Sequence, residues 1–491
     1  MLPSLARAAI LAMGVAPPTV QKPIRHYVAW TGTEGRSISC HDWGSTRTLY
    51  RAIACVLLVV LQAELLWADK PLPVRVLDVA PVWSGHPVGF ALLTRGKRQL
   101  VAFYSADRRL TIGARNLDES DWQLMRLPSV LGWDSHNYIT MAVDDAGQIH
   151  VSGNMHCHPL VYFRTERPGD INSFRQFPSM TGRNEQRCTY PRFLCGPQGG
   201  LIFTYRDGRS GSGDQYCNVY DVKTETWRRL IDSPLFSGGG KMNAYFTGPV
   251  QDQSGLFHIC WVWRNTPDCA TNHDLCYARS KDLVLWETST GRALSLPMTL
   301  ATAEVADPVP PGGGMINGNT RIGFDADGRP VISYHKFDAG GKTQLYNARR
   351  EGSGWQIHQT SDWDYRWEFQ GGGTIRFEIG FGPVAASPDG SLTQTWNHVK
   401  HGTGNWKLDP QTLKPVGKAL PRSSGLPRGF ARVESTWPGM EVRTAADLGA
   451  CDEPKVRYML RWETLPSNRD RPRPEPLPPP TMLRLYQVRE P

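Results

Sequence analysis

Residues 135–156 read SHNYITMAVDDAGQIHVSGNMH. Alternating apolar residues on both sides of the Asp-Asp-Ala-Gly turn predict a β-hairpin. Because the strands of a hairpin are antiparallel, His136 and Asn137 should lie across from Asn154 and His156, far from the turn. We expect these polar side chains to meet at one end of the strand pair, where they can bind an anion, bind a metal or transfer protons. A structural pair of histidines is the alternative interpretation.

A glycine turn followed by a strand-forming run recurs along the chain. Each copy continues with β-branched or aromatic residues, and several are followed by a second unit that ends in Trp. Such spacing is longer than a hairpin and suits a four-stranded blade with loops of varied length. The turn glycines are Gly147, Gly200, Gly255, Gly328 and Gly390, at steps of 53, 55, 73 and 62 residues.

This repeat predicts an all-β fold, a β-propeller with seven blades. A copy at residues 101–122 brings the number of units to six. Strands from residues 73–95, 456–465 and 483–488 are expected to close the seventh blade. A β-solenoid is the structural alternative, but its repeats would be shorter and more regular.

The composition fits many short strands joined by turns. The 491 residues include 48 Gly, 38 Pro, 17 Trp and 16 Tyr, and 21% are charged. Aromatic side chains in this number are available for packing or for stacking on sugars. The formal net charge is +9, but no Lys/Arg run of the nucleic-acid-binding kind stands out. The dispersed charge argues against a nucleic-acid partner and is compatible with an anionic substrate.

The N-terminal part carries an apolar segment. Arg51 is followed by AIACVLLVVLQAELLWADK, a basic residue and a short apolar run of the signal-peptide type. We interpret residues 49–68 as this signal and residues 1–48 as a spurious or disordered extension. A membrane anchor is the alternative, although the run is short for a transmembrane helix. Residues 69–491 are then expected to form one propeller domain of an exported protein, with the Pro-rich residues 466–481 as a surface excursion.

A second polar cluster joins CTYPRF at 188–193 to TYRDGRSGSGDQ at 204–215. Tyr190 precedes a proline, so its backbone is extended and its phenol can be held rigidly. Arg206 stands at a sharp Gly-rich turn and could hold a carboxylate through two hydrogen bonds. A surface turn with an ion-paired arginine is the alternative. Tyr205 competes with Tyr190 because it also neighbours the arginine.

A third cluster, HICWVWRNTPDCATNHDLCYARS at 258–280, combines cysteines and histidines. These residue types suit tetrahedral zinc, but the spacing matches no standard finger. A structural zinc and a disulfide between two of the cysteines, with His273 lining a cleft, both remain open. The candidate metal ligands are His258, Cys260, Cys269, His273 and Cys276.

Together HNYITMAVDDAGQIHVSGNMH, TYPRF, YRDGRSGSG, WVWRNTPDCATNHDLCYARS and TQLYNAR resemble BNR-repeat propeller proteins of the ulvan lyase type. The resemblance covers residues 75–410. Sialidase-style Asp-box repeats are poorly represented, which argues against a sialidase. The resemblance implies a seven-bladed propeller that cleaves an acidic polysaccharide by β-elimination beside a uronic acid.

The resemblance also implies roles for single residues. Tyr190 would act as base and as acid, Arg206 and His136 would neutralise the uronate carboxylate, and His156 would assist or replace the base. Positive charge at the carboxylate stabilises the enolate-like state, and a nearby cation favours a reactive phenolate. The expected substrate-binding residues are Asn137, Asn154, His273 and Tyr205.

The predicted function is an exported polysaccharide lyase that acts on an ulvan-like chain of rhamnose and uronate. We expect no cofactor for catalysis, a possible structural zinc, no protein partner and a monomer. One alternative is a rhamnosidase-like hydrolase on the same fold, but glycosidases usually need two opposed carboxylates and no such pair is evident. The other is a carbohydrate-binding propeller without catalysis, against which the His/Tyr/Arg set argues.

Overall fold

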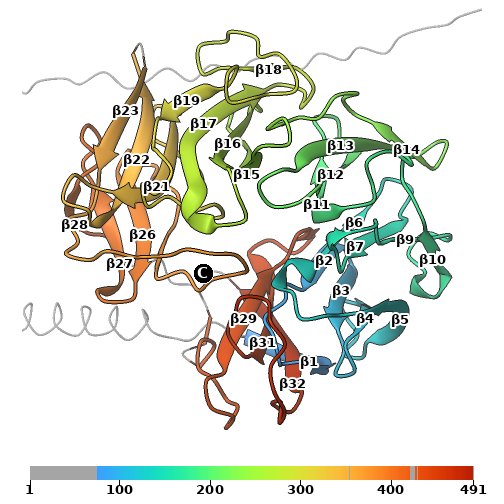
Figure 1. Ribbon diagram of the computed structural model, residues 1–491. Helices are drawn as coiled ribbons and strands as arrows, with labels where there is room; N and C mark the ends of the chain where they lie inside the picture. The colour runs from blue at the N-terminus through green and yellow to red at the C-terminus, as the bar shows by residue number, and fades with distance from the viewer. Residues whose placement is uncertain (1–73, 353, 421–425, 428, 490–491) are drawn as a thin grey trace, which may run out of the picture. The chain divides into compact units, whose positions relative to one another are not determined.

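The chain divides into two compact units, residues 1–70 and 71–491. The described residues all belong to the second unit, so the predictions for residues 1–48 and 49–68 lie outside them. Among the described residues, no helix is both long enough and apolar enough to span a membrane. The computed structural model (Figure 1) describes residues 74–352, 354–420, 426–427 and 429–489.

The described unit is an all-β propeller, as the sequence predicts (Figure 1). Nearly all of its strands pair antiparallel, which agrees with the short strands and frequent turns of the sequence. Helical structure in the described ranges is limited to three short 3-10 turns, η1 (Ser135–Asn137), η2 (Ile171–Ser173) and η3 (Cys269–Thr271).

Five of the six sheets of the described unit contain four or five strands each. Strands named next to one another are hydrogen-bonded to each other. The first contains β1 (Val74–Val82), β32 (Thr481–Arg489), β31 (Val456–Thr464) and β29 (Glu441–Ala446). The second contains β30 (Ala450–Cys451), β2 (Ala91–Gly96), β3 (Arg98–Tyr104), β4 (Arg109–Asn116) and β5 (Gln123–Val130). The third contains β10 (Phe174–Phe177), β9 (Tyr162–Thr165), β7 (Ile149–Gly153) and β6 (Ile139–Val143). The fourth contains β14 (Thr226–Arg229), β13 (Asp214–Asp221), β12 (Leu201–Asp207), β11 (Cys188–Cys195) and β8 (His156–His158).

Two further sheets complete the described unit. The fifth contains β15 (Asn243–Gln251), β16 (Phe257–Arg264), β17 (Asn272–Ser280) and β18 (Trp286–Glu287), with β19 (Glu304–Asp307) also paired to β17. The sixth has nine strands: β23 (Gly354–Gln359), β22 (Thr343–Glu351), β21 (Pro330–Phe337), β20 (Arg321–Phe324), β25 (Ala385–Ala386), β26 (Leu392–His398), β27 (Gly402–Leu408) and β28 (Pro415–Lys418), with β24 (Ile379–Phe381) on β26. Its two antiparallel halves join at the parallel pair Phe324–Ala385. The number of seven blades stays a prediction.

The first and last strands of the described unit share one sheet. β1 pairs with β32 over Val74↔Val488 to Val82↔Thr481, and β32 also pairs with β31. The sequence assigned these three strands to a closing blade, and their pairing confirms it. The two ends of the unit are therefore held together by backbone hydrogen bonds and by the buried side chains of Leu483 and Leu485.

Each repeated glycine turn connects two strands that are consecutive in the chain, β6–β7, β11–β12, β15–β16, β20–β21 and β25–β26, and the last two turns lie in the same nine-stranded sheet. In four of the turns Gly147, Gly255, Gly328 and Gly390 have φ between 75° and 87°, a left-handed conformation that glycine adopts without strain. The exception is the turn between β11 and β12, where Gly199 rather than Gly200 has the positive φ, at 86°. The pattern found in the sequence therefore marks real hairpins.

Antiparallel pairing places the site residues at one end of the strands. In each hairpin, the start of the first strand lies next to the end of the second strand, as the pairs Thr189↔Arg206 and Asn243↔Arg264 show. The first strand β6 also contacts β2 and β11 in the two neighbouring sheets. Side chains at the starts of neighbouring first strands can therefore act on one ligand.

Candidate active site

The hairpin of β6 and β7 brings His136 and His156 together. Ile139 pairs with Gly153, and the Asn154 amide donates to the Asn137 carbonyl at 3.2 Å, so both histidines lie just beyond the strand ends. Their rings stack with centroids 4.1 Å apart. The local arrangement expected from the sequence is thus present.

Asp134 orients both imidazole rings. Its Oδ1 lies 2.7 Å from Nδ1 of His136, and its Oδ2 lies 2.5 Å from Nδ1 of His156. With both Nδ1 atoms engaged, the Nε2 atoms are the ring nitrogens that can meet a substrate. Burial raises the pKa of Asp134, but the hydrogen bonds and charge of His136 and His156 outweigh burial and lower it well below its usual range. Asp134 therefore stays ionised and holds the histidine pair.

One group of side chains has the spacing of a metal site. Among the described residues, it is the one set of three or more His, Cys, Asp or Glu side chains whose possible metal-binding atoms all lie within 4.8 Å of one another, and it consists of Asp134, His136 and His156. Nitrogen–oxygen separations of 2.5 and 2.7 Å are those of charge-assisted hydrogen bonds. These contacts engage both oxygens of the carboxylate and Nδ1 of each ring.

A second carboxylate, Asp470, supports the histidine pair from the Pro-rich segment. Its Oδ1 accepts hydrogen bonds from the Ser135 amide at 3.1 Å and the Ser135 hydroxyl at 2.8 Å, and its Oδ2 lies 3.6 Å from Nδ1 of His136. It also lies 3.3 Å from Nε2 of His86. Burial raises the pKa of Asp470, but the bonds from His86 and Ser135 outweigh burial and hold it well below its ordinary value.

Tyr190 lies beside the histidines on β11. Its ring centroid is 5.5 Å from that of His136. The residue has φ of 60°, so the extended backbone expected before a proline is wrong. A left-handed conformation is costly for a tyrosine, and such strain concentrates at functional positions. Burial raises the pKa of the Tyr190 phenol well above its usual value. Tyr190 is therefore a neutral phenol that can donate a proton.

A second tyrosine, Tyr245, completes the site at the start of β15. Its ring lies 5.9 Å from that of Tyr190, and its hydroxyl lies 2.7 Å from that of Ser210. The guanidinium groups of Arg206 and Arg264 lie 5.8 and 5.6 Å from its ring centroid. Burial raises the pKa of Tyr245, but these two charges and its hydrogen bonds outweigh burial and lower it.

Arg206 lies beneath the two phenols and is only 2% exposed. Its guanidinium lies 5.0 Å from the Tyr190 ring centroid, donates to the Tyr245 hydroxyl at 3.3 Å and donates to the Thr189 hydroxyl at 3.2 Å. The sequence suggested a direct grip on a substrate carboxylate from an open turn. The structure instead places this charge where it acts on the two tyrosines.

Three residues expected to bind substrate have mainly structural contacts. Asn137 is buried, and its carbonyl accepts the Tyr104 hydroxyl at 2.6 Å. The Asn154 side chain donates to the Ser129 hydroxyl at 2.8 Å, and its backbone has φ of 59°. Tyr205 is fully buried in a hydrophobic cluster and accepts a hydrogen bond from Arg229 at 3.0 Å. None of these contacts involves the histidine pair or Tyr190.

His273 is buried, with both ring nitrogens engaged. Nδ1 lies 2.9 Å from Asp274 Oδ2, and Nε2 lies 2.8 Å from Asn265 Oδ1. The neighbouring Asn272 pairs with Arg264 in the sheet, so His273 borders the tyrosine site without facing it. Its expected substrate contact stays a prediction.

The predicted zinc ligands are not brought together. Cys260, Cys276 and Cys269 are buried in three different hydrophobic clusters, and His258 lies between the Tyr277 hydroxyl at 2.6 Å and Asp252 at 3.1 Å. The eight cysteines of the described ranges are also free thiols, so the disulfide alternative is not formed there. Strand alternation explains the separation, since Cys260 and Cys276 point to opposite faces of their sheet.

Sequence reasoning missed Tyr245, Arg264 and Asp470 as site residues and left Asp134 without a role. One signal could have found Tyr245: Tyr190 and Tyr245 are each the third residue of a first strand, in β11 and β15. Asp470 has no comparable signal, because it lies 335 residues from Ser135, its hydrogen-bonding partner.

The fold and site together define a β-propeller with a His/Tyr/Arg cluster at one end of its strands. A family model for BNR repeat-containing proteins matches residues 98–363, more than half of the chain. The chain belongs to this BNR repeat-containing family. Comparison with curated proteins gives no match.

Solved structures share the fold at low sequence identity. The crystal structure of polysaccharide lyase Uly1 has a TM-score of 0.57 and 15% identity, and the match covers 86% of this chain and 100% of that one. A PL25 ulvan lyase has a TM-score of 0.55 and 16% identity, with 84% and 96% covered. The same enzyme bound to -[GlcA(1-4)Rha3S]- has a TM-score of 0.54 and 15% identity. These likenesses establish the propeller fold.

Proposed function

We propose that this protein is a polysaccharide lyase that cleaves an acidic, uronate-containing glycan by β-elimination. The observation that carries the proposal is geometric: two adjacent phenols, Tyr190 and Tyr245, lie between the stacked histidine pair and the buried guanidinium of Arg206. The pKa of Tyr190 is raised by burial and that of Tyr245 is lowered by its arginine neighbours, which agrees with separate acid and base roles. Paired groups with separated pKa values are what acid and base roles require. The similar solved structures include an ulvan lyase, which supports an ulvan-like substrate.

In the proposed reaction, the base removes the proton at C5 of the uronate, next to the carboxylate. The electron pair forms the C4–C5 double bond, the bond from C4 to the glycosidic oxygen breaks, and the acid protonates the departing oxygen. Tyr245, whose deprotonated form is favoured by the two neighbouring arginines, is the base in this scheme. Tyr190, as a neutral phenol, is the acid.

The charges of the site suit this chemistry. The Nε2 atoms of His136 and His156 are available to bind the uronate carboxylate, and Arg206 supplies positive charge beneath the phenols. Stabilising the charge that develops on the carboxylate lowers the barrier to loss of a weakly acidic proton. Arg206 thus acts through the tyrosines rather than by direct contact with substrate.

A hydrolase is the second candidate, because Asp134 and Asp470 are two carboxylates in one site. A glycosidase needs one carboxyl group with a raised pKa as its acid. The pKa values of both aspartates are instead lowered, and both hold histidines. This arrangement favours elimination over hydrolysis.

The test is to incubate the protein with ulvan and to follow ultraviolet absorbance. The proposal predicts a rise from the unsaturated uronate, and the rise should disappear in Tyr190→Phe. Free rhamnose or new reducing ends without absorbance would indicate the hydrolase. Binding without either product would indicate a carbohydrate-binding propeller. An acidic polymer would be met outside the cell if residues 49–68 export the protein, as the sequence predicts.

A further inference from the structure

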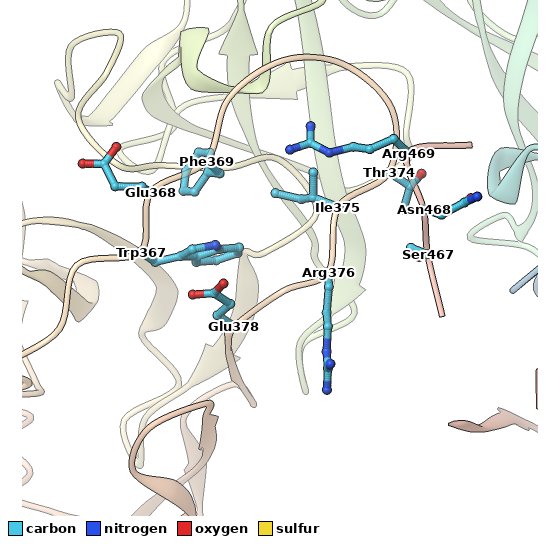
Figure 2. A pocket seen from close by; sticks show the side chains of 10 residues that line it. All are labelled: Trp367, Glu368, Phe369, Thr374, Ile375, Arg376, Glu378, Ser467, Asn468 and Arg469. Carbon is cyan, nitrogen blue, oxygen red and sulfur yellow. The ribbon is translucent and has the colours of Figure 1, made fainter. Parts of the chain in front are cut away.

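A hollow of about 230 Å³ lies near the histidine pair. It is formed by two segments far apart in sequence, residues 367–378 and 467–469 (Figure 2). Thr374 lines it and also contacts the active site, because its hydroxyl lies 2.6 Å from that of Ser135 and its amide donates to Asp470 at 2.7 Å. A sugar in this hollow would therefore neighbour the sugar at the histidines.

Two arginines and two carboxylates line the hollow, and one of the carboxylates is neutralised by an arginine outside it. Of its two carboxylates, Glu368 is paired with Arg366 and Glu378 accepts the Tyr365 hydroxyl, and neither partner lines the hollow. No polar partner of the Arg376 guanidinium is found among the described residues, and Arg376 is exposed. Arg376 can therefore bind an anion at little cost in lost contacts.

Arg469 adds a second cation whose position is fixed. Its Nη1 donates to the carbonyls of Gln370 at 2.7 Å and Gly372 at 3.1 Å. Figure 2 shows Arg469 and Arg376 extending in different directions from the two sides of the hollow. Arg469, which is held by these two carbonyls, is next to Asp470 in the chain and so lies on the active-site side of the hollow. Arg376 lies farther from the active site.

Apolar side chains supply the remaining surface. Phe369 is half-buried, with Ile375 near it and Trp367 behind it, the two aromatic rings 4.9 Å apart (Figure 2). Phe377 is 38% exposed next to Arg376. The lining is therefore mixed, with polar and charged groups beside aromatic rings.

A second hollow of about 300 Å³ continues the first and shares Arg376 and Glu378 with it. His398 lines this hollow and is buried, and its Nδ1 accepts the amides of Lys400 at 3.0 Å and His401 at 3.3 Å. The neutral ring then carries its proton on Nε2, and this buried atom has no hydrogen-bonding partner among the described residues. An unpaired buried donor indicates a ligand acceptor at this point.

We propose that the two hollows are subsites for the sugars beside the cleaved linkage, and that Arg376 binds an anionic group on one of them. The group is a carboxylate or a sulfate ester, since both offer oxygens to a guanidinium. The inference rests on the proposed function for the identity of the polymer, but it adds a binding site outside the His/Tyr/Arg cluster. A site extended in this way favours polymer over short fragments.

The test compares Arg376→Ala with Arg292→Ala, a matched control. Arg292 is also exposed, and it lies beyond β18, away from both hollows. We expect Arg376→Ala to raise KM for ulvan on the order of tenfold with kcat nearly unchanged, because one charge-assisted contact is lost. Equal KM values for the two variants on ulvan would overturn the subsite.

Binding to ulvan, measured by affinity electrophoresis, separates failure of the subsite from failure of the lyase proposal. If the wild type binds ulvan more tightly than Arg376→Ala but releases no unsaturated product, the subsite stands and the lyase proposal falls. Desulfated ulvan identifies the group. If the wild type and Arg376→Ala bind desulfated ulvan equally well, the group that Arg376 binds is a sulfate ester. If the wild type still binds it more tightly, the group is a carboxylate. A wild type that binds no better than Arg376→Ala contradicts the subsite.

Discussion

At the residue scale, the site is explained by what each charged or polar group faces. Both phenols lie beside the Arg206 guanidinium, 5.0 Å from the Tyr190 ring centroid and 5.8 Å from that of Tyr245. The Tyr245 hydroxyl also forms hydrogen bonds with Arg206 and Ser210. The same side chain therefore has a raised pKa in one position and a lowered pKa in the other. Environment, rather than residue type, assigns the two proton-transfer roles.

Replacing either phenol should stop turnover without unfolding the protein. Tyr190→Phe and Tyr245→Phe should each lower kcat on the order of 10²-fold or more, because each removes a proton-transfer group. Initial rates of ultraviolet absorbance on ulvan measure this loss, with Tyr205→Phe as the control tyrosine from the core. A larger loss in Tyr205→Phe than in the two site variants would contradict the assignment.

The pH profile should report Tyr245. A general base acts when deprotonated, so kcat/KM should rise with pH through the pKa of Tyr245, which lies below the ordinary phenol value of about 10. Because the pKa of Tyr190 is raised, the acid stays protonated and no fall is expected below about pH 10. The residual activity of Tyr245→Phe should lack the rising limb. If the pH profile of Tyr245→Phe matched that of the wild type, another residue would be the base.

Asp134 should couple stability to pH. Its pKa is lowered by folding, so its contribution is present above the unfolded value of about 3.9 and is lost as pH falls below it. We expect the melting temperature of Asp134→Asn to be lower than that of the wild type near neutral pH. The difference between the two melting temperatures should shrink as the pH is lowered. Thermal unfolding at several pH values measures this, and a gap that widens in acid would contradict the role.

At the element scale, the hairpins were predictable because their signals are local. A Gly turn and alternating apolar residues lie within ten residues of each other, as in DDAGQIHVSG. Contacts across the sequence were not predictable in the same way. Asp470 reaches Ser135 through a loop whose path depends on Gly373, Thr374 and Arg469, and the Cys/His cluster was divided by strand alternation.

The loop at residues 370–374 should be sensitive to a single methyl group. Gly373 has φ of 76°, and a Cβ there would lie 2.5 Å from the Arg469 carbonyl oxygen. Gly312 has nearly the same φ, 77°, but nothing lies within 4 Å of its Cβ position. Both alanine variants should lose about 1 kcal/mol of unfolding free energy from the backbone.

Gly373→Ala should lose more stability than Gly312→Ala and should also lose activity, because the collision moves Arg469 and the adjoining Asp470. Denaturant unfolding and lyase rates of the two variants measure the difference. Equal stability and equal activity would show that the loop does not position the site.

At the scale of the whole propeller, closure depends on the pairing of β1 with β32. Leu485 on β32 is fully buried opposite Leu77, whereas Val76 on β1 is 44% exposed. Leu485→Ala should lower the unfolding free energy by about 2–5 kcal/mol, as large-to-small core changes do. Val76→Ala should change it by less than about 1 kcal/mol. Equal denaturation midpoints for the two variants would contradict a closed ring.

The central claim is that the His/Tyr/Arg cluster performs elimination, and one measurement tests it most directly. The protein is incubated with ulvan while ultraviolet absorbance and reducing ends are recorded together, for the wild type and for Tyr190→Phe. The account predicts that both signals rise in parallel in the wild type and that neither rises in the variant. Reducing ends that appear without absorbance would contradict it.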